Sequence, residues 1–309
     1  MTFMDDPMLN AMRLMAPEDR LIYVLRHVAA SGRLPLQHFQ ELTQTIMGLC
    51  ELGSEYRDSV GIRHIQRGQA DIVQNFRRQI IGDDKFLVLD IGANTGDFSR
   101  AIIDADFKGR VIAFEPIQRH ADQMRRNWQN DSRFSVEAAA VGDREGWADL
   151  NVCESETGLS SLLPISRDYH YFNDEFNQDQ QSLERVQTTT LDAYMRRHPE
   201  LASYENVALK VDTQGFEYPV FCGARKLLKS GRVKAILVEV MACPKYDRAK
   251  TYKEIFNYLH DLKFSIYDLL PFYREIDMQF QMSHQGRLTE FDCLFVSEGF
   301  LAAQRRAAA

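Results

Sequence analysis

The sequence is poor in cysteine and holds no paired cysteine motif. Its five cysteines are odd in number, and no two of them form a Cys-x-x-Cys pair. This usage favours buried free thiols in a reducing compartment over a framework of disulfides. The eight histidines likewise include no His-x-x-x-His spacing of the kind that binds a metal.

Long apolar runs, a signal segment and an excess of basic residues are also missing. No apolar run reaches the ~18 to 20 residues that cross a bilayer. The N-terminal stretch from Met1 to Asp6 lacks a basic start and an apolar core. The net charge is −7, from 37 basic and 44 acidic residues. We therefore expect a cytoplasmic protein that binds neither a membrane nor nucleic acid.

The composition that is present fits a folded protein with a full core. Of the 309 residues, 45% are hydrophobic and 26% are charged. The length favours one main domain at 83–300, preceded by an N-terminal helical extension at 1–82. Apolar stripes predict helices at 17–31 and 36–51, and a third helix at 69–81 leads into the first strand. We expect the stripes to pack within the chain, with a homo-oligomer through these helices as the alternative.

The most informative segment runs from Phe86 to Ser99. An apolar run ends at Asp90, Gly92 and Gly96 bracket a turn, and a helix-compatible stretch follows. This order is typical of a nucleotide-type ligand site in an α/β sheet. The glycines let the backbone approach the ligand, and the helix N-terminus receives its negative end. The spacing Asp-x-Gly-x-x-x-Gly differs from Gly-x-Gly-x-x-Gly, so it argues against a dinucleotide and favours S-adenosylmethionine.

A second apolar run, from Arg110 to Phe114, leads into Glu115 and Pro116. Glu115 lies 25 positions after Asp90, a suitable length for one strand-helix-strand unit. An acid at this strand end can accept hydrogen bonds from both ribose hydroxyls, while the proline ends the strand. A solvated carboxylate without a ligand is the alternative for Glu115. The nearby turn from Gly92 to Gly96, which we call the glycine loop, favours ribose binding.

Two further residues complete the predicted cofactor site. Asn94 lies in the glycine loop, where it would surround the methionyl part together with Asp90 and the two glycines. A role in capping the following turn is the alternative for Asn94. Asp143 follows the third predicted strand, where an acid can reach the adenine amino group. Its alternative is a turn residue, because Gly142 and Asp143 are a good turn pair.

Lys210 and Asp212 form a charged pair at the end of an apolar run. Alternation places both on one face of a strand, near the carboxyl end where ligands bind in open α/β sheets. We interpret Asp212 as a general base or a ligand of a divalent metal, and Glu239 ends the next strand and completes the catalytic set. A structural ion pair is the alternative. Magnesium stays open, because the sequence shows no clear third ligand.

Strands alternate with helices from residue 86 onward, which predicts a largely parallel sheet. The polar and aromatic stretch at 154–185 is predicted as a long loop between edge-like strands at 148–152 and 186–190. The last two strands, at 264–268 and 292–296, are expected to pair antiparallel. The other strands are predicted at 86–90, 110–114, 134–140, 207–212 and 234–239, and the helices at 97–105, 118–129, 218–229 and 250–261.

Several of these motifs occur together in a known family. They are Val88 to Ser99, Phe114 to Pro116, Ala140 to Asp143, Ser160-Ser161, Leu209 to Glu217 and Leu237 to Glu239. Over about residues 84 to 298 the chain resembles the FkbM-type family of S-adenosylmethionine-dependent methyltransferases. The resemblance implies a Rossmann-like class I methyltransferase fold, which is an α/β fold whose mostly parallel sheet has an antiparallel last strand. It also implies O-methylation of a sugar or secondary-metabolite hydroxyl.

Three other functions were considered for this sequence, and each is less favoured than O-methyl transfer. A nicotinamide-dependent oxidoreductase would need Gly-x-Gly-x-x-Gly after the first strand, which is absent. Many N-methyltransferases carry an Asn/Asp-Pro-Pro-Tyr loop where this chain has Asp212-Thr-Gln-Gly215. A catalytically silent binding protein would not require all of Asp90, Glu115, Lys210 and Asp212. The sequence therefore favours an S-adenosylmethionine-dependent O-methyltransferase that acts on a small molecule or a glycan.

Overall fold

The computed structural model describes residues 76, 86–105, 107–154, 156–166, 181–242, 245–271 and 290–308. The chain divides into two units, Met1–Asp71 and Ile72–Ala309, and all described residues belong to the second. Apart from Phe76, the predicted helices at 17–31, 36–51 and 69–81 lie outside the described residues. They stay predictions, as does the domain boundary at 82.

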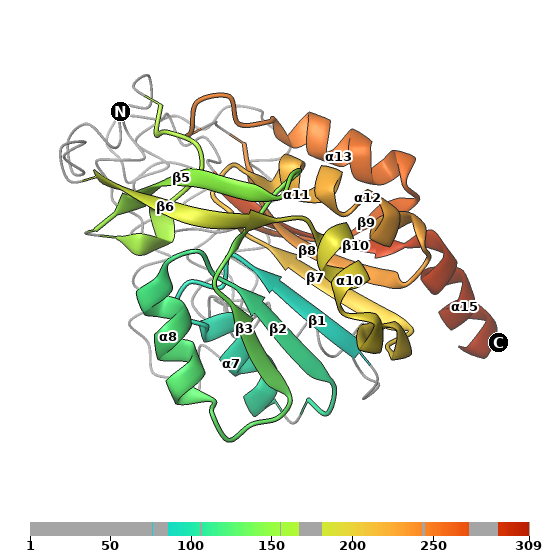
Figure 1. Cartoon of the computed structure of the whole chain (residues 1–309). Coiled ribbons are helices and arrows are strands. Elements are labelled where there is room, and N and C mark those ends of the chain that lie inside the picture. Colours follow the sequence, from blue (N-terminus) through green and yellow to red (C-terminus); the bar gives the residue numbers. More distant parts are fainter. Residues whose placement is uncertain are drawn as a thin grey trace, which may run out of the picture. The chain divides into compact units, whose positions relative to one another are not determined.

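A seven-stranded sheet forms the centre of the second unit (Figure 1). Its order is β3-β2-β1-β7-β8-β10-β9. All neighbours from β3 to β8 pair parallel, and β10 pairs antiparallel with both β8 and β9. This order confirms the predicted mostly parallel sheet with an antiparallel last strand. The strands are β1 (Phe86–Ile91), β2 (Arg110–Phe114), β3 (Phe134–Glu137), β7 (Asn206–Val211), β8 (Val233–Met241), β9 (Phe264–Pro271) and β10 (Glu290–Ser297).

Helices cover both faces of this sheet, and this explains the continuous apolar runs of the inner strands. All six residues of β1 are buried, as expected for a parallel strand between two helical layers. One layer holds α7 (Asp97–Asp104), α8 (Gln118–Asn127) and α15 (Glu298–Ala308), whose apolar side chains share one core cluster. The other layer holds α10 (Leu191–Arg197), α11 (Glu217–Gly223), α12 (Arg225–Lys229) and α13 (Tyr252–Asp261).

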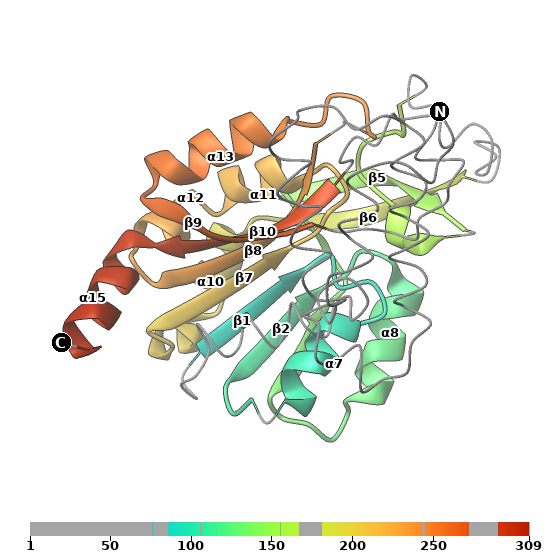
Figure 2. The same ribbon diagram turned by 180° about the vertical axis from the view of Figure 1, so that it is seen from behind.

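A second sheet begins shortly after the end of β3 and has the strand order β4-β6-β5. Its strands are β4 (Ala140–Val141), β5 (Gly146–Cys153) and β6 (Gln181–Thr189). Figures 1 and 2 both show β5 and β6 beyond the carboxyl ends of β1 and β7. The small sheet therefore stands at the edge where ligands bind in open α/β folds.

The second sheet corrects two predictions. The strand predicted at 134–140 is two strands, because β3 ends at Glu137 and Ala140 pairs with Thr188 in the other sheet. The loop predicted at 154–185 is too long, since β6 already begins at Gln181. The first half of β6 has a polar sequence that resembles a loop, and its pairing with β5 holds it extended.

The helical layers differ from the prediction at three places. The single helix predicted at 218–229 is two helices, α11 and α12, separated at Ala224. Helices α10 and α15 were not among the predicted helices. None of the described helices is both long and apolar enough to span a membrane.

Candidate functional site

The loop after β1 turns sharply against the end of β7. Gly92 has a φ of +80°, and a Cβ at this position would lie 1.8 Å from the carbonyl oxygen of Asp212. The amide nitrogens of Gly92 and Ala93 donate to the carbonyl oxygen of Phe114, which closes the turn on β2. Asn94 also has a positive φ, of 49°. The glycine at 92 is therefore required by both backbone conformation and space.

Asp90 is completely buried at the end of β1, and its two oxygens differ in their contacts. Its Oδ2 accepts from Ser99 Oγ at 2.7 Å. Among the described residues, its Oδ1 has no hydrogen-bond partner, and Lys210 Nζ lies 3.7 Å away from it. Burial raises the pKa of Asp90, while Lys210 acts in the opposite direction. A buried carboxylate oxygen without a donor is costly, so the site favours a ligand that brings one.

Glu115 joins the end of β2 to the glycine loop. Its Oε2 accepts from the amide of Asn94 at 2.7 Å, and its Oε1 accepts from the amide of Ile117 at 2.9 Å. Burial raises the pKa of Glu115 to about 7, against the lowering effect of these two hydrogen bonds. Each oxygen keeps a second acceptor position for a ligand. The structure thus brings Glu115 to Asn94, in the loop that follows Asp90.

Lys210 lies between the glycine loop and Asp212. Its Nζ is 3.2 Å from Asp212 Oδ2 and donates to the carbonyl oxygen of Gly92 at 3.1 Å. Burial alone would lower the pKa of Lys210, but the carboxylates of Asp212 and Asp90 raise it overall. Burial would raise the pKa of Asp212, but Lys210 and hydrogen bonds lower it overall. The lysine is therefore cationic and Asp212 is ionised.

Glu239 belongs to the same cluster through Gln214, a residue that the sequence pattern alone does not single out. Gln214 Nε2 donates to Asp212 Oδ1 at 3.0 Å and to Glu239 Oε2 at 2.6 Å. Burial, followed by the charge of Asp212, raises the pKa of Glu239 well above its ordinary value. The environment thus favours the ionised form of Asp212 and the protonated form of Glu239. Environments that separate the pKa values of two neighbouring carboxyl groups are typical of acid–base sites.

A short segment beside the second sheet connects the glycine loop to Gln214. Thr157 Oγ1 donates to Asn94 Oδ1 at 3.2 Å, and Ser161 Oγ donates to the carbonyl oxygen of Gln214 at 2.8 Å. Tyr246 Oη lies 2.8 Å from the carbonyl oxygen of Leu159 and 3.0 Å from Gln214 Oε1. We call residues 156–161 the bridging segment. Gln214 is part of a motif visible in the sequence, whereas Tyr246 gives no sequence signal.

Glu217 and Asp143 lie outside the cluster that Lys210, Asp212, Gln214 and Glu239 form. Glu217 Oε1 accepts from the amides of Thr213 and Gly215, each at 3.0 Å, so it shapes the turn before α11. Asp143 follows β4 of the second sheet instead of β3, and its Oδ1 lies 3.7 Å from Arg144 Nε at the surface. The predicted strand that precedes Asp143 is thus divided between the two sheets, and the contact of Asp143 with adenine stays a prediction.

The structure gives no support to a magnesium ion at Asp212 and Glu239. Within the described residues, no group of three or more His, Cys, Asp or Glu side chains could hold a metal. The position that faces both carboxyl groups holds the amide nitrogen of Gln214. That nitrogen is a hydrogen-bond donor, and it takes the place where a cation would have to bind.

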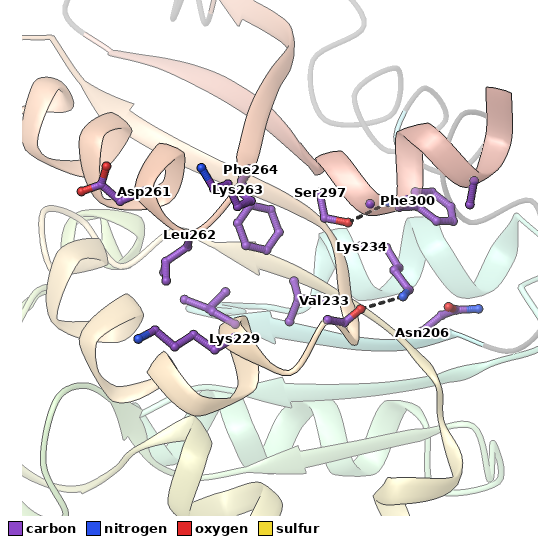
Figure 3. Close-up of a pocket in the computed structure, with 14 residues that line it drawn as sticks. Asn206, Lys229, Val233, Lys234, Asp261, Leu262, Lys263, Phe264, Ser297 and Phe300 are labelled. Carbon is purple, nitrogen blue, oxygen red and sulfur yellow. Dashed lines mark hydrogen bonds between the residues drawn. The ribbon is translucent and has the colours of Figure 1, made fainter. Parts of the chain in front are cut away.

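A cavity of about 660 Å³ lies at the opposite edge of the sheet. Figure 3 shows it between the first residues of β7, β8 and β9, represented by Asn206, Val233 and Phe264, and the region of α15 around Phe300. Lys229, Lys234 and Lys263 also line it. None of the predicted site residues does so, and the candidate site remains at the carboxyl edge.

Comparisons with known proteins point to one family. A family model described as the methyltransferase FkbM domain matches residues 90–266. No curated protein gives a significant match. Among solved structures, methyltransferase FkbM from Methylobacillus flagellatus KT is 14% identical, with 69% of this chain and 44% of that chain covered and a TM-score of 0.42. This chain therefore spans less than half of that protein.

Two further solved structures are similar to this chain. A candidate S-adenosylmethionine-dependent methyltransferase from Listeria monocytogenes is 10% identical over 75% of this chain and 99% of that chain, with a TM-score of 0.42. Aeropyrum pernix fibrillarin with natively bound S-adenosyl-L-methionine is 12% identical over 69% of this chain and 67% of that chain, with a TM-score of 0.37.

Proposed function

The chain belongs to the FkbM methyltransferase family, and on that premise we propose that it transfers the methyl group of S-adenosylmethionine to a hydroxyl group. The acceptor is a sugar, a glycan or a secondary metabolite. The observation that carries this proposal is the position of Lys210. It contacts the glycine loop on one side and Asp212 on the other, so the cofactor side and the acceptor side are adjacent.

The residues at the end of β1 and β2 fit the cofactor. The unpartnered Oδ1 of Asp90 suits the ammonium group of its methionyl part, and the free acceptor positions of Glu115 suit the ribose hydroxyls. Gly92, Asn94 and Gly96 would supply backbone that approaches the ligand closely. S-adenosylmethionine supplies a methyl group that is already activated by its sulfonium. The protein's task is therefore alignment and proton transfer, and alignment contributes about 7 to 11 kcal/mol at best.

Asp212 is proposed to accept the proton of the acceptor hydroxyl. Lys210 keeps Asp212 ionised, and the Oδ2 of Asp212 is the oxygen nearest to that cation. Glu239, whose pKa is raised by burial, lies on the other side of Gln214, where its protonated form would donate a hydrogen bond to an acceptor oxygen. One ionised and one protonated carboxyl group would then orient a hydroxyl before methyl transfer.

We expect purified protein to bind S-adenosylmethionine saturably and to give no heat with NAD⁺ in titration calorimetry. The glycine loop lacks the spacing of a dinucleotide site, so NAD⁺ has no matching phosphate cradle. A second titration with Mg²⁺ present should give the same affinity. Saturable NAD⁺ binding would contradict the proposal, and binding of neither cofactor would favour a catalytically silent protein with this fold.

Binding of S-adenosylmethionine is expected to weaken as the pH falls below 7. Because burial raises the pKa of Glu115 to about 7, the carboxylate that accepts from ribose hydroxyls is lost by protonation as the pH falls through this value. The dissociation constant should therefore be about tenfold larger at pH 6 than at pH 8. Glu115→Gln should weaken binding at pH 8 and remove most of this pH dependence, whereas Glu184→Gln at the surface should change neither. Unchanged binding by Glu115→Gln would remove Glu115 from the cofactor site.

We also propose a cytoplasmic location, since Cys222 and Cys293 are free thiols in the described part of the structure. The acceptor is proposed to be a small molecule or a glycan, with no role for nucleic acid or a membrane. The predicted N-terminal helices either pack within the chain or join two copies, and gel filtration of the full chain distinguishes these arrangements.

A further inference from the structure

Gln214 combines an unusual backbone conformation with a buried polar side chain. It has a φ of +53°, in the left-handed region that favours glycine, and it is only 4% exposed. Strained backbone of this kind persists only where surrounding contacts hold it, and it is concentrated at functional sites. The turn between β7 and α11 thus maintains a conformation that directs the side chain of Gln214 towards Asp212 and Glu239.

All polar groups of the Gln214 side chain have partners. Its two N–H groups go to Asp212 Oδ1 and Glu239 Oε2, and its Oε1 lies 3.0 Å from the hydroxyl of Tyr246. An ionised carboxylate only accepts hydrogen bonds, so the orientation of the amide is fixed: nitrogen to the carboxyl groups, oxygen to the phenol. The single phenol proton is shared between Gln214 and the carbonyl oxygen of Leu159 in the bridging segment.

These contacts fix both oxygens of Asp212. Oδ1 is held by Gln214 at 3.0 Å, and Oδ2 is held by Lys210 at 3.2 Å. Because both oxygens are held, the carboxylate of Asp212 keeps one orientation, and its remaining lone pairs keep fixed directions. Loss of either anchor would let it rotate about its terminal bond, which is soft in aspartate.

We propose that Gln214 is a positioning residue that holds Asp212 and Glu239 as one acceptor-facing pair, with Tyr246 and the bridging segment holding Gln214 in turn. This inference rests on the proposed function and extends it to residues that touch neither the cofactor nor the acceptor. The bridging segment also reaches Asn94 through Thr157. Hydrogen bonds through Gln214, Tyr246 and the bridging segment therefore connect the acceptor-facing pair to the glycine loop.

Crystal structures of the wild-type protein and of Gln214→Met, both soaked with S-adenosylmethionine, test the positioning directly. Methionine has a similar length and shape but cannot donate to the carboxyl groups. We expect the Asp212 carboxylate to rotate away from its wild-type orientation and Glu239 to separate from it. An unchanged Asp212–Glu239 pair in Gln214→Met would overturn the proposal. Gln118→Met, which removes an exposed contact to Asp122 on α8, is the matched control.

Kinetics distinguish positioning from a purely structural role. Turnover is followed as release of S-adenosylhomocysteine with a panel of methyl glycosides and simple phenols as hydroxyl probes. Gln214→Met should lower kcat by about 100-fold, the effect expected for a misplacement of about 1 Å. Its dissociation constant for S-adenosylmethionine and its Tm should stay near the wild-type values. Tyr246→Phe should lower kcat by a smaller factor, and Tyr258→Phe, whose hydroxyl contacts Phe221, should not change it.

Failure of the inference and failure of the proposed function give different results. If the wild-type protein neither binds S-adenosylmethionine nor methylates any probe, the proposed function fails, and the crystal structures still decide whether Gln214 positions the pair. If the wild-type protein methylates a probe and Gln214→Met retains its kcat, the inference fails alone. A parallel fall in Tm and kcat would assign Gln214 a structural role and would also overturn the proposal.

Discussion

Asp212→Asn is expected to lower kcat by about 10² to 10⁴-fold, the range that a positioned general base contributes. Asparagine has nearly the same shape but cannot take a proton from a hydroxyl. The dissociation constant for S-adenosylmethionine should change by less than about threefold, because Lys210 keeps its contacts to Asp90 and to the carbonyl oxygen of Gly92. Release of S-adenosylhomocysteine gives kcat, and titration calorimetry gives the affinity.

The matched control for this prediction is Asp149→Asn, which removes an exposed carboxylate on β5. It should leave both quantities at the wild-type level. If Asp212→Asn keeps its kcat, Asp212 is not the base, and the ion pair with Lys210 has the structural role considered from the sequence. If the variant instead loses cofactor affinity, Asp212 acts on the cofactor side of Lys210.

Gly92→Ala is expected to destabilise the protein by about 3 kcal/mol or more and to prevent cofactor binding. The φ of +80° disfavours any residue with a Cβ, and that Cβ would lie 1.8 Å from the carbonyl oxygen of Asp212. All six residues of β1 are buried and pair with β7, so the two backbones cannot separate here without disrupting that pairing. Urea unfolding of the two proteins measures the difference in free energy.

Gly231→Ala separates the two causes of this destabilisation. Gly231 has a similar φ, of +75°, but a Cβ at this position would meet no atom of the described residues within 4 Å. Its substitution should therefore cost only the left-handed backbone penalty, about 1 to 2 kcal/mol. Equal destabilisation by Gly92→Ala and Gly231→Ala would show that the contact with Asp212 does not constrain the loop.

The main sheet could be predicted because local sequence and final environment agree there. The apolar runs at 86–90 and 110–114 are β1 and β2 almost to the residue, since a strand buried on both faces has an apolar sequence. The break between β3 and β4 could not be predicted, because Ala138 and Ala139 carry no turn signal. That break is set by Thr188, the partner of Ala140, which lies almost fifty residues further along the chain.

The residues of the candidate site show the same difference between local sequence signals and long-range contacts. Asp90, Glu115 and Asp212 could be selected as candidates because each lies at or just after the end of a strand, and strand ends are visible in a sequence. The role of Gln214 could not be predicted, although its motif is visible, because its partners Glu239 and Tyr246 are 25 and 32 residues away. Such contacts depend on the order of strands in the sheet, which a local pattern does not specify. Asp143 shows the converse case, in which a residue selected from a local motif follows β4, a strand of the second sheet.

The pairing of β1 with β7 has a consequence for biosynthesis. Asp90 lies beside Lys210 in this ladder, and the contact of Lys210 with Gly92 spans 118 positions of the chain. A nascent chain that has not yet emerged as far as β7 carries Asp90 without its cation, on a strand with one open edge. Long-range pairing of this kind closes late in folding. We expect ribosome-bound chains that end before residue 206 to be protease-sensitive and unable to retain S-adenosylmethionine, with both properties changing together once β7 has emerged.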